Sequence, residues 1–149
     1  MRIVESLGIR YEVAAYPVGE DHLDAAEVAR ALGVSAEIVF KTLVARDERS
    51  EVLVFCVPGD CELELRKAAK ASGSKKVELV ALRDLTPLTG YVRGGCSPVG
   101  MKKIFPTWID EIALAYERIY VNAGTRGMQM IMTVADLLRA AGARIADLV

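Results

Sequence analysis

A glycine-rich stretch at residues 89–103 is the first part of this sequence whose residue types could do chemistry. It carries four of the twelve glycines, and its Gly94 and Gly95 are followed closely by Ser97 and Pro98. Glycine is needed where the backbone takes a positive φ or lets a ligand approach closely. Backbone N–H groups left bare in such a loop would suit a carbonyl oxygen or a developing oxyanion. A tight pair of turns between two strands explains the same glycines equally well. The phosphate-binding patterns G-x-x-x-x-G-K-[ST] and G-x-G-x-x-G are both absent.

A lysine inside an apolar strand is the second candidate. Lys41 lies in a run at 39–44 that reads Val-Phe-Lys-Thr-Leu-Val, and a period of two places it on one face with Val39 and Leu43. Such a lysine can point to solvent and protect the edge of a sheet from aggregation. It can also point into a cleft and hold a carboxyl, carbonyl or phosphate oxygen. The pattern alone leaves both interpretations open.

Two further segments carry groups that could bind phosphate. Residues 121–127 are expected to leave a strand and turn through Gly124, which presents Arg126 to a phosphate or simply closes a hairpin. The second segment is a basic run without acidic residues at 66–76, with two more lysines further along the chain. This set comprises Arg66, Lys67, Lys70, Lys75, Lys76, Lys102 and Lys103. It is either a solvated face or a seat for an RNA backbone.

The side chains of most hydrolytic and metal sites are missing from the sequence. There is no G-x-S-x-G elbow, and His22 is the only histidine. The three cysteines, Cys56, Cys61 and Cys96, show no C-x-x-C spacing, so we expect free thiols, no metal and no cofactor. An enzyme with this composition would work with backbone amides, a lysine, water and groups of its own substrate.

These candidates need a scaffold that brings distant segments together, and the residue patterns predict a mixed one. Strands are predicted at 11–16, 40–46, 51–57, 77–80, 104–105, 108–109, 119–121 and 128–132. Helices are predicted at 4–8, 24–32, 62–72 and 81–85, and a last one between Thr133 and Gly142, with Asp24 and Glu27 as a capping box. Because the helices and strands follow no regular βαβ alternation, we expect one α+β domain over 1–149, with a mixed, largely antiparallel sheet flanked by helices.

Composition narrows the class of protein. Hydrophobic residues make up 52% of the 149 and charged residues 26%, which is a globular balance. The 19 basic and 20 acidic residues nearly cancel, so a nucleic-acid partner must be argued from local patches. The longest apolar runs are of strand length, and no apolar signal segment follows Met1. We therefore expect a cytoplasmic protein without a membrane partner.

Taken in order, several segments of the chain resemble the YbaK family of free-standing aminoacyl-tRNA deacylases. The segments are 40–43 (Phe-Lys-Thr-Leu), 65–70, 75–78, the whole stretch 89–103 and 119–127. They are also similar to the editing insertion of bacterial prolyl-tRNA synthetases. The resemblance implies the fold of that domain and hydrolysis of tRNA(Pro) carrying Cys, Ala or another small amino acid. The implied partner is aminoacylated tRNA, and an aminoacyl-tRNA synthetase is a further candidate.

The resemblance also implies roles for individual residues. Lys41 matches the functional lysine that contacts the aminoacyl ester, and Gly94 matches a backbone site for the aminoacyl carbonyl. Asn122 stands where family members often carry Ser, and Tyr16 is expected to form a pocket wall. The other expected substrate contacts are Tyr91, Gly95, Ser97, Pro98, Gly124 and Arg126, and the seven basic residues above are expected to contact tRNA. The implied mechanism is substrate-assisted, with a ribose hydroxyl of the terminal adenosine helping to position or activate water.

Two other functions remain open at this level. One is a module of the same fold that binds tRNA or a synthetase without hydrolysis. The other is a small-molecule enzyme unrelated to tRNA. The presence of Lys41 together with the complete 94–98 element favours the deacylase over both.

Overall fold

The computed structural model describes residues 2–19 and 23–149. The helices within these ranges are α1 (Arg2–Ser6), α2 (Ala25–Leu32), α3 (Leu65–Ser72), α4 (Leu82–Thr89) and α5 (Val134–Ala141), with 3-10 turns at Ala36–Ile38 and Glu111–Ala115. The strands are β1 (Glu12–Ala15), β2 (Phe40–Asp47), β3 (Val52–Pro58), β4 (Val77–Leu79), β5 (Thr107–Asp110), β6 (Arg118–Asn122), β7 (Met128–Thr133) and β8 (Ala143–Ala146). In this part of the chain no helix is long and apolar enough to cross a membrane.

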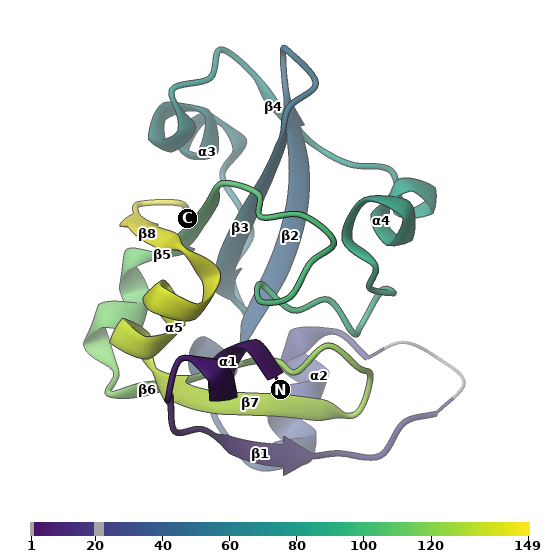
Figure 1. Ribbon diagram of the computed structural model, residues 1–149, viewed down its shortest axis with the longest axis vertical. Helices are drawn as coiled ribbons and strands as arrows, with labels where there is room; N and C mark the ends of the chain where they lie inside the picture. The colour runs from purple at the N-terminus through teal and green to yellow at the C-terminus, as the bar shows by residue number, and fades with distance from the viewer. Residues whose placement is uncertain (1, 20–22) are drawn as a thin grey trace.

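The strands form two sheets. One has the order β4-β2-β3-β5-β8, and the other has the order β1-β7-β6 (Figure 1). Within the two sheets, as far as the structure describes the chain, the β3–β5 and β5–β8 ladders are parallel and the other ladders are antiparallel. A single parallel bridge between Val39 and Tyr120 connects the sheets where the chain enters β2. The predicted α+β class, largely antiparallel and flanked by helices, is confirmed. The prediction of one sheet was wrong, because β1, β7 and β6 pair with one another as a separate sheet.

Capping residues fix the ends of the helices where the sequence predicted them. The Asp24 side chain accepts from the Glu27 N–H at 2.8 Å, and the Glu27 side chain reaches back to the Asp24 N–H, so the capping box before α2 is confirmed. Gly33 ends α2 in the left-handed conformation at φ 70°. Thr133 caps α5 and Gly142 ends it.

The structure differs from the local predictions at four places. Residues 104–105 form no strand, and Ile104 is 94% exposed. The helix predicted at 62–72 begins only at Leu65, because the Glu64 side chain caps the Arg66 N–H. Strand β8, which no pattern predicted, lies parallel to β5. The helix predicted at 81–85 continues to Thr89 and ends at Gly90.

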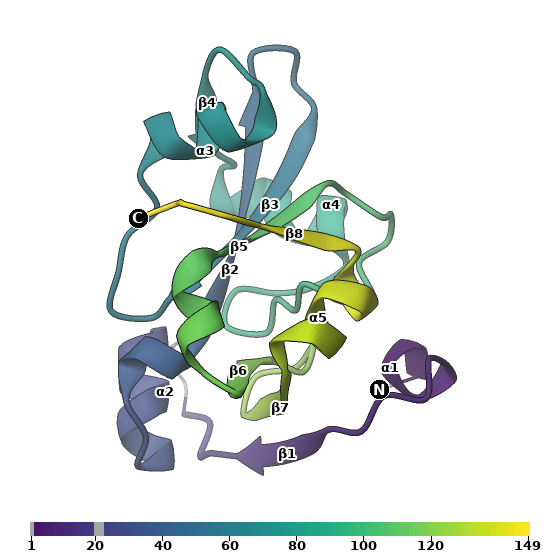
Figure 2. The same cartoon turned by 90° about the vertical axis from the view of Figure 1, so that its left-hand side faces the viewer.

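Buried side chains form separate clusters around these sheets. The largest includes Phe40, Ile109, Ile119 and Met130, which join β2 and β5 to the three-stranded sheet. A second cluster lies between α3 and the five-stranded sheet, and a third lies under α2. Helices α3 and α4 lie on opposite sides of the long β2–β3 hairpin (Figures 1 and 2).

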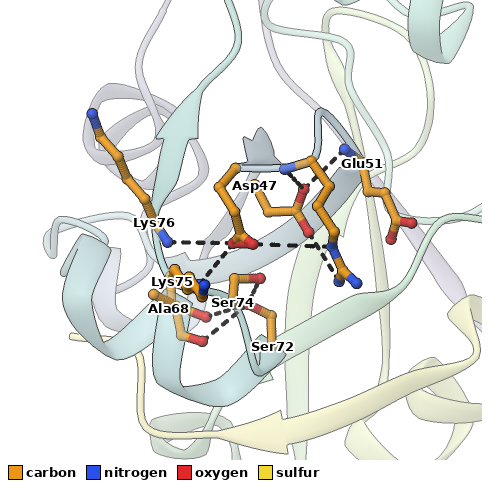
Figure 3. A network of polar contacts seen from close by, with 10 residues as sticks. Asp47, Glu51, Ala68, Ser72, Ser74, Lys75 and Lys76 are labelled. Carbon is orange, nitrogen blue, oxygen red and sulfur yellow. Dashed lines mark hydrogen bonds and ion pairs between the residues drawn. The ribbon is translucent and has the colours of Figure 1, made fainter.

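A polar network fixes the segment after α3 to the turn of that hairpin (Figure 3). The Glu48 carboxylate accepts from the Lys75 N–H at 2.7 Å. Burial of the Asp47 side chain opposes its ionisation, but N–H groups of Glu51 and Arg49 donate to its carboxylate and lower its pKa. The network holds the tip of the hairpin, six residues along β2 from Lys41.

Candidate active site

A cavity of about 500 Å³ lies along one edge of β2. Its walls come from the start of α2, the first half of β2, the segment from β4 into α4, the loop at 93–96, and the facing strands β6 and β7. Tyr16, which follows β1, also lines it, so segments far apart in the chain meet at one cavity. Its inner end is polar.

Lys41 lines this cavity. Strand β4 pairs with β2 only from Ala45 to Asp47, so the first half of β2 keeps an open edge. Lys41 is half-buried on that half of the strand, and no carboxylate in the described ranges lies within ion-pair distance of it. Lys41 therefore lies on an unpaired strand edge, as an edge-protecting lysine would, and it also lines a cavity, as a substrate-binding lysine would.

The loop at 93–96 brings Gly94 to the cavity. Gly94 has a φ of 82°, a conformation that a residue with a side chain rarely adopts. Its carbonyl accepts from Asn122 Nδ2 at 2.8 Å, and no acceptor in residues 2–19 or 23–149 bonds its N–H. The neighbouring Gly95 N–H already donates to the Val92 carbonyl at 2.9 Å. Of the two glycine amides, Gly94 is therefore the one able to serve a ligand.

Asn122 connects the two glycine loops. It lies at the end of β6, is 8% exposed and lines the cavity. Its Nδ2 donates to the Gly94 carbonyl, and its Oδ1 accepts from the Gly124 N–H at 2.7 Å. Both ends of the amide are engaged by main chain, so the side chain holds the Gly94 turn in place.

Gln129 is a polar cavity residue that the sequence analysis missed. It lies on β7 directly opposite Asn122, is only 4% exposed and lines the cavity. Its Oε1 is the one buried side-chain oxygen or nitrogen of the described residues without a hydrogen-bond partner. A buried acceptor left unpaired costs about 1–3 kcal/mol, so it indicates a place where a donor is expected to bind.

The other predicted substrate contacts divide into two groups. Tyr16 lines the cavity, and together with Arg126 it also lines a small adjoining hollow. Arg126 Nη2 donates to the Gly19 carbonyl at 3.1 Å. The remaining predicted contacts do not line the cavity; they are Tyr91, Gly95, Ser97, Pro98 and Gly124.

This second group holds the loop together instead. The Tyr91 hydroxyl donates to the Val99 carbonyl at 2.6 Å, and Ser97 Oγ accepts from the Val99 N–H. A Cβ on Gly95 would come within 3.1 Å of the backbone nitrogen of Arg126, so the glycine lets the two loops pack closely. A Cβ on Gly124 would come within 3.0 Å of the Tyr91 ring.

None of the seven basic residues lines the cavity. Lys67 donates to Asp147 and to the Val149 carbonyl, and Lys76 pairs with Glu78 at 2.8 Å. Lys102 Nζ donates to the Pro87 carbonyl, at the end of α4. Arg66, Lys70, Lys75 and Lys103 are exposed. Helix α3, which carries Arg66, Lys67 and Lys70, lies on the far side of the hairpin from α4 (Figures 1 and 2).

The cysteine nearest the site is protonated. Burial raises the pKa of the Cys96 thiol, which lines the cavity, to about 12, and it does the same for Cys56. A thiol of that pKa is neutral at pH 7 and a poor nucleophile. In the described ranges, no three His, Cys, Asp or Glu side chains group as metal ligands. His22 lies outside these ranges.

The outer end of the cavity is mostly apolar. Leu79, Val80, Leu82 and Leu85 form it, and Arg93 lies beside Gly94. Sequence reasoning did not select these residues, because single leucines beside a turn are ordinary on a protein surface.

Comparisons with known proteins identify relatives of this chain. Residues 20–140 match the family of the aminoacyl-tRNA editing domain. An Enterococcus faecalis protein named as a candidate Cys-tRNA(Pro)/Cys-tRNA(Cys) deacylase, EbsC, is 45% identical over 99% of this chain and 90% of its own length. A proline–tRNA ligase of Pelotomaculum thermopropionicum is 38% identical over 52% of this chain and 14% of the ligase.

A solved structure gives the same result in three dimensions. The crystal structure of a candidate trans-editing enzyme for prolyl-tRNA synthetase is 30% identical, with a TM-score of 0.82, over 93% of this chain and 85% of its own. A match across most of the chain, with high identity to a relative of nearly equal length, shows the family. The chain belongs to the aminoacyl-tRNA editing domain family.

Proposed function

We propose that this chain is a free-standing deacylase that hydrolyses the ester bond of mischarged tRNA. The proposed substrate is tRNA(Pro) carrying a small amino acid such as Cys or Ala. The observation that carries the proposal is the meeting of Lys41 and Gly94 at one cavity, in a chain of the editing family. EbsC, which the chain matches over nearly its whole length, is named for the same class of substrate.

In this proposal the protein orients the ester and stabilises the charge that develops on it. The Lys41 ammonium contacts the ester region, and the Gly94 N–H donates to the aminoacyl carbonyl as it becomes an oxyanion. Asn122 keeps the Gly94 turn in place through its two hydrogen bonds. The tetrahedral intermediate then collapses with release of the free amino acid and the tRNA hydroxyl.

Water is the proposed nucleophile. Cys96 is a neutral thiol, and no serine of the described residues lines the cavity. The ribose hydroxyl next to the ester is the group of the substrate that helps to position or activate this water. The protein therefore needs no paired nucleophile and base.

The inner end of the cavity is the proposed amino-acid pocket. The unpaired Gln129 Oε1 is an acceptor for the α-ammonium group that every aminoacyl ester carries. The size of this pocket would then set the choice among small amino acids, with one methylene worth about 1–3 kcal/mol of discrimination.

Contacts with the rest of the tRNA would come from the exposed basic residues. Lys75 and Lys76 lie beside the hairpin tip, and six residues of extended strand separate this tip from Lys41 by about 20 Å. At that distance they would meet phosphates of the acceptor stem rather than the terminal nucleotide. A synthetase partner remains part of the proposal without a surface assigned to it.

The test is a deacylation assay on tRNA(Pro) charged separately with Ala, Cys, Ser and Pro. We expect rapid release of a small noncognate amino acid, slow release of Pro, and loss of release in Lys41→Ala. Binding of every charged tRNA without turnover would instead support a noncatalytic module. If the protein neither binds nor hydrolyses any of the charged tRNAs, tRNA is not its substrate and the proposal fails.

A further inference from the structure

We infer that the outer half of the cavity binds the adenine base of the terminal nucleotide, between the open edge of β2 and the apolar wall of β4 and α4. This inference rests on the proposed function, because the ester at the inner end fixes where the nucleoside begins. It adds a recognition site for the base, formed by the Thr42 main chain together with Leu79, Val80, Leu82 and Leu85.

The cavity is larger than a small aminoacyl group requires. Its volume of about 500 Å³ falls within the range of sites that enclose a whole drug-sized ligand. It follows β2 from Lys41 to Val44, and three residues of extended strand span about 10 Å. An ester held at Lys41 would therefore leave room for the ribose and its base towards Val44.

The open edge of β2 presents a donor and an acceptor to this space. The Val44 carbonyl accepts from the Val80 N–H at 3.0 Å, so the main chain of Val44 faces β4. In an antiparallel ladder the N–H and C=O of one residue point to the same side, and the side alternates along the strand. The main chain of Thr42 consequently faces the same way as that of Val44.

Two contacts on β3 support this assignment of sides. Phe40 pairs with Pro58, which has no N–H to donate, so Phe40 and every second residue after it turn their main chain away from β3. The Val54 N–H, opposite Val44, donates to the Pro106 carbonyl on the far side of β3. Since β4 begins to pair only at Ala45, no described strand covers the Thr42 edge, and Thr42 lines the cavity.

The chemistry of adenine matches both parts of this site. Adenine presents an exocyclic amino donor beside a ring-nitrogen acceptor, which is the complement of a backbone C=O beside an N–H. Its flat faces are apolar, and the wall beyond Val44 offers Leu79 and Leu82, which are 51% and 59% exposed. Arg93 also lines the cavity and is exposed, so its guanidinium is available to the phosphate on the nucleotide's 5′ side.

The first test compares alanyl esters of four small acceptors: adenosine, purine riboside, inosine and ribose without a base. Purine riboside keeps the ring but lacks the amino group, and inosine replaces that donor with an acceptor. We expect kcat/KM to fall about tenfold for purine riboside and further for inosine and the abasic ester, since one hydrogen bond of this kind contributes about a factor of ten. Equal rates on all four esters would overturn the inference. If none of the four is hydrolysed while charged tRNA is, the base alone cannot account for recognition and the inference also fails. If charged tRNA is not hydrolysed either, the proposed function fails.

The second test locates the base on the wall. In Leu82→Ala, KM for alanyl-adenosine should rise about tenfold while kcat/KM for the abasic ester stays unchanged. Leu114→Ala is the matched control, because Leu114 is 64% exposed and lies outside the cavity. Leu82 is itself exposed, so its replacement leaves the core intact. An equal loss on both esters, or no loss on either, would place the base elsewhere.

Discussion

Replacement of Asn122 tests whether the Gly94 turn is held in place for catalysis. In Asn122→Ala the Gly94 carbonyl loses its donor and the Gly124 N–H loses its acceptor. Both glycines are half-buried, so each group would cost about 1 kcal/mol, at the low end for an unsatisfied polar group. We therefore expect the free energy of unfolding to fall by about 2 kcal/mol. For a chain of this size that corresponds to a decrease in Tm of roughly 4–8 °C.

The effect on turnover should exceed the effect on folding. If the released turn moves the Gly94 N–H away from the oxyanion, one donor is lost, which typically costs about 3 kcal/mol or a factor of more than a hundred in rate. Asn122→Asp is the informative companion variant. Its carboxylate can still accept from the Gly124 N–H but repels the Gly94 carbonyl, so it should separate the two hydrogen bonds.

Single-turnover deacylation and urea denaturation on the same preparations show whether Asn122 positions the Gly94 N–H for catalysis or only stabilises the fold. A rate per folded molecule that stays at the wild-type value in Asn122→Ala, together with the expected loss of stability, would make Asn122 a purely structural residue. An unchanged stability would mean that the two hydrogen bonds carry no weight, which would refute the reasoning from the start.

Other predictions concern single side chains. Lys41→Ala should lower turnover at least a hundredfold without changing the urea midpoint, whereas Arg144→Ala, which removes an exposed basic residue outside the cavity, should change neither. Gln129→Leu should raise the free energy of unfolding by about 1 kcal/mol, because it removes an unpaired buried acceptor, and should raise KM for aminoacyl substrates; a KM equal to wild type would exclude Gln129 from binding. Asp47 has a lowered pKa, so its contribution to stability is present above the unfolded value near 3.9 and is lost as the pH falls towards the folded pKa. Unfolding free energies at pH 7 and pH 3 should therefore differ less in Asp47→Asn than in wild type, and an equal difference would contradict the assignment.

Helix caps and helix-ending glycines could be predicted because they depend only on residues that are neighbours in the sequence. The capping box at Asp24 and the stop at Gly33 need only the chain around them, and both are present. A strand was wrongly predicted at residues 104–105 because Phe105 precedes Pro106. A residue before proline is extended whether or not a strand pairs with it. Strand β8 was missed for the opposite reason: its extended state comes from pairing with β5, over thirty residues earlier in the chain.

The site residues also differ in whether a local sequence pattern indicates them. Lys41 and Gly94 stood out because a charge in an apolar run and a pair of glycines are unusual in themselves. Gln129 did not, since Met-Gln-Met reads as ordinary alternation along a strand. Its importance arises only when β6 places Asn122 opposite it and the Asn122 amide bonds to the glycine loops instead. An unpaired acceptor is a property of the assembled pocket, so no local pattern could have predicted it.

The described groups that face the proposed substrate are mainly backbone amides and single, unpaired side chains, and this has a consequence for how the site tolerates change. The Gly94 N–H and the Thr42 main chain are supplied by the fold, so substitutions at many positions leave them in place. These groups can bind a substrate only while the 93–96 loop stays in place and the β2 edge stays open. The loop depends on the hydrogen bond from Asn122 and on the absence of a side chain at Gly95. The open edge depends on the pairing of β4 ending at Ala45. Extending β4 by one strand pair towards Thr42 would satisfy more backbone hydrogen bonds and stabilise the sheet. The same change would close the edge that we assign to the base, so a more stable protein with impaired turnover is the expected result of such a design.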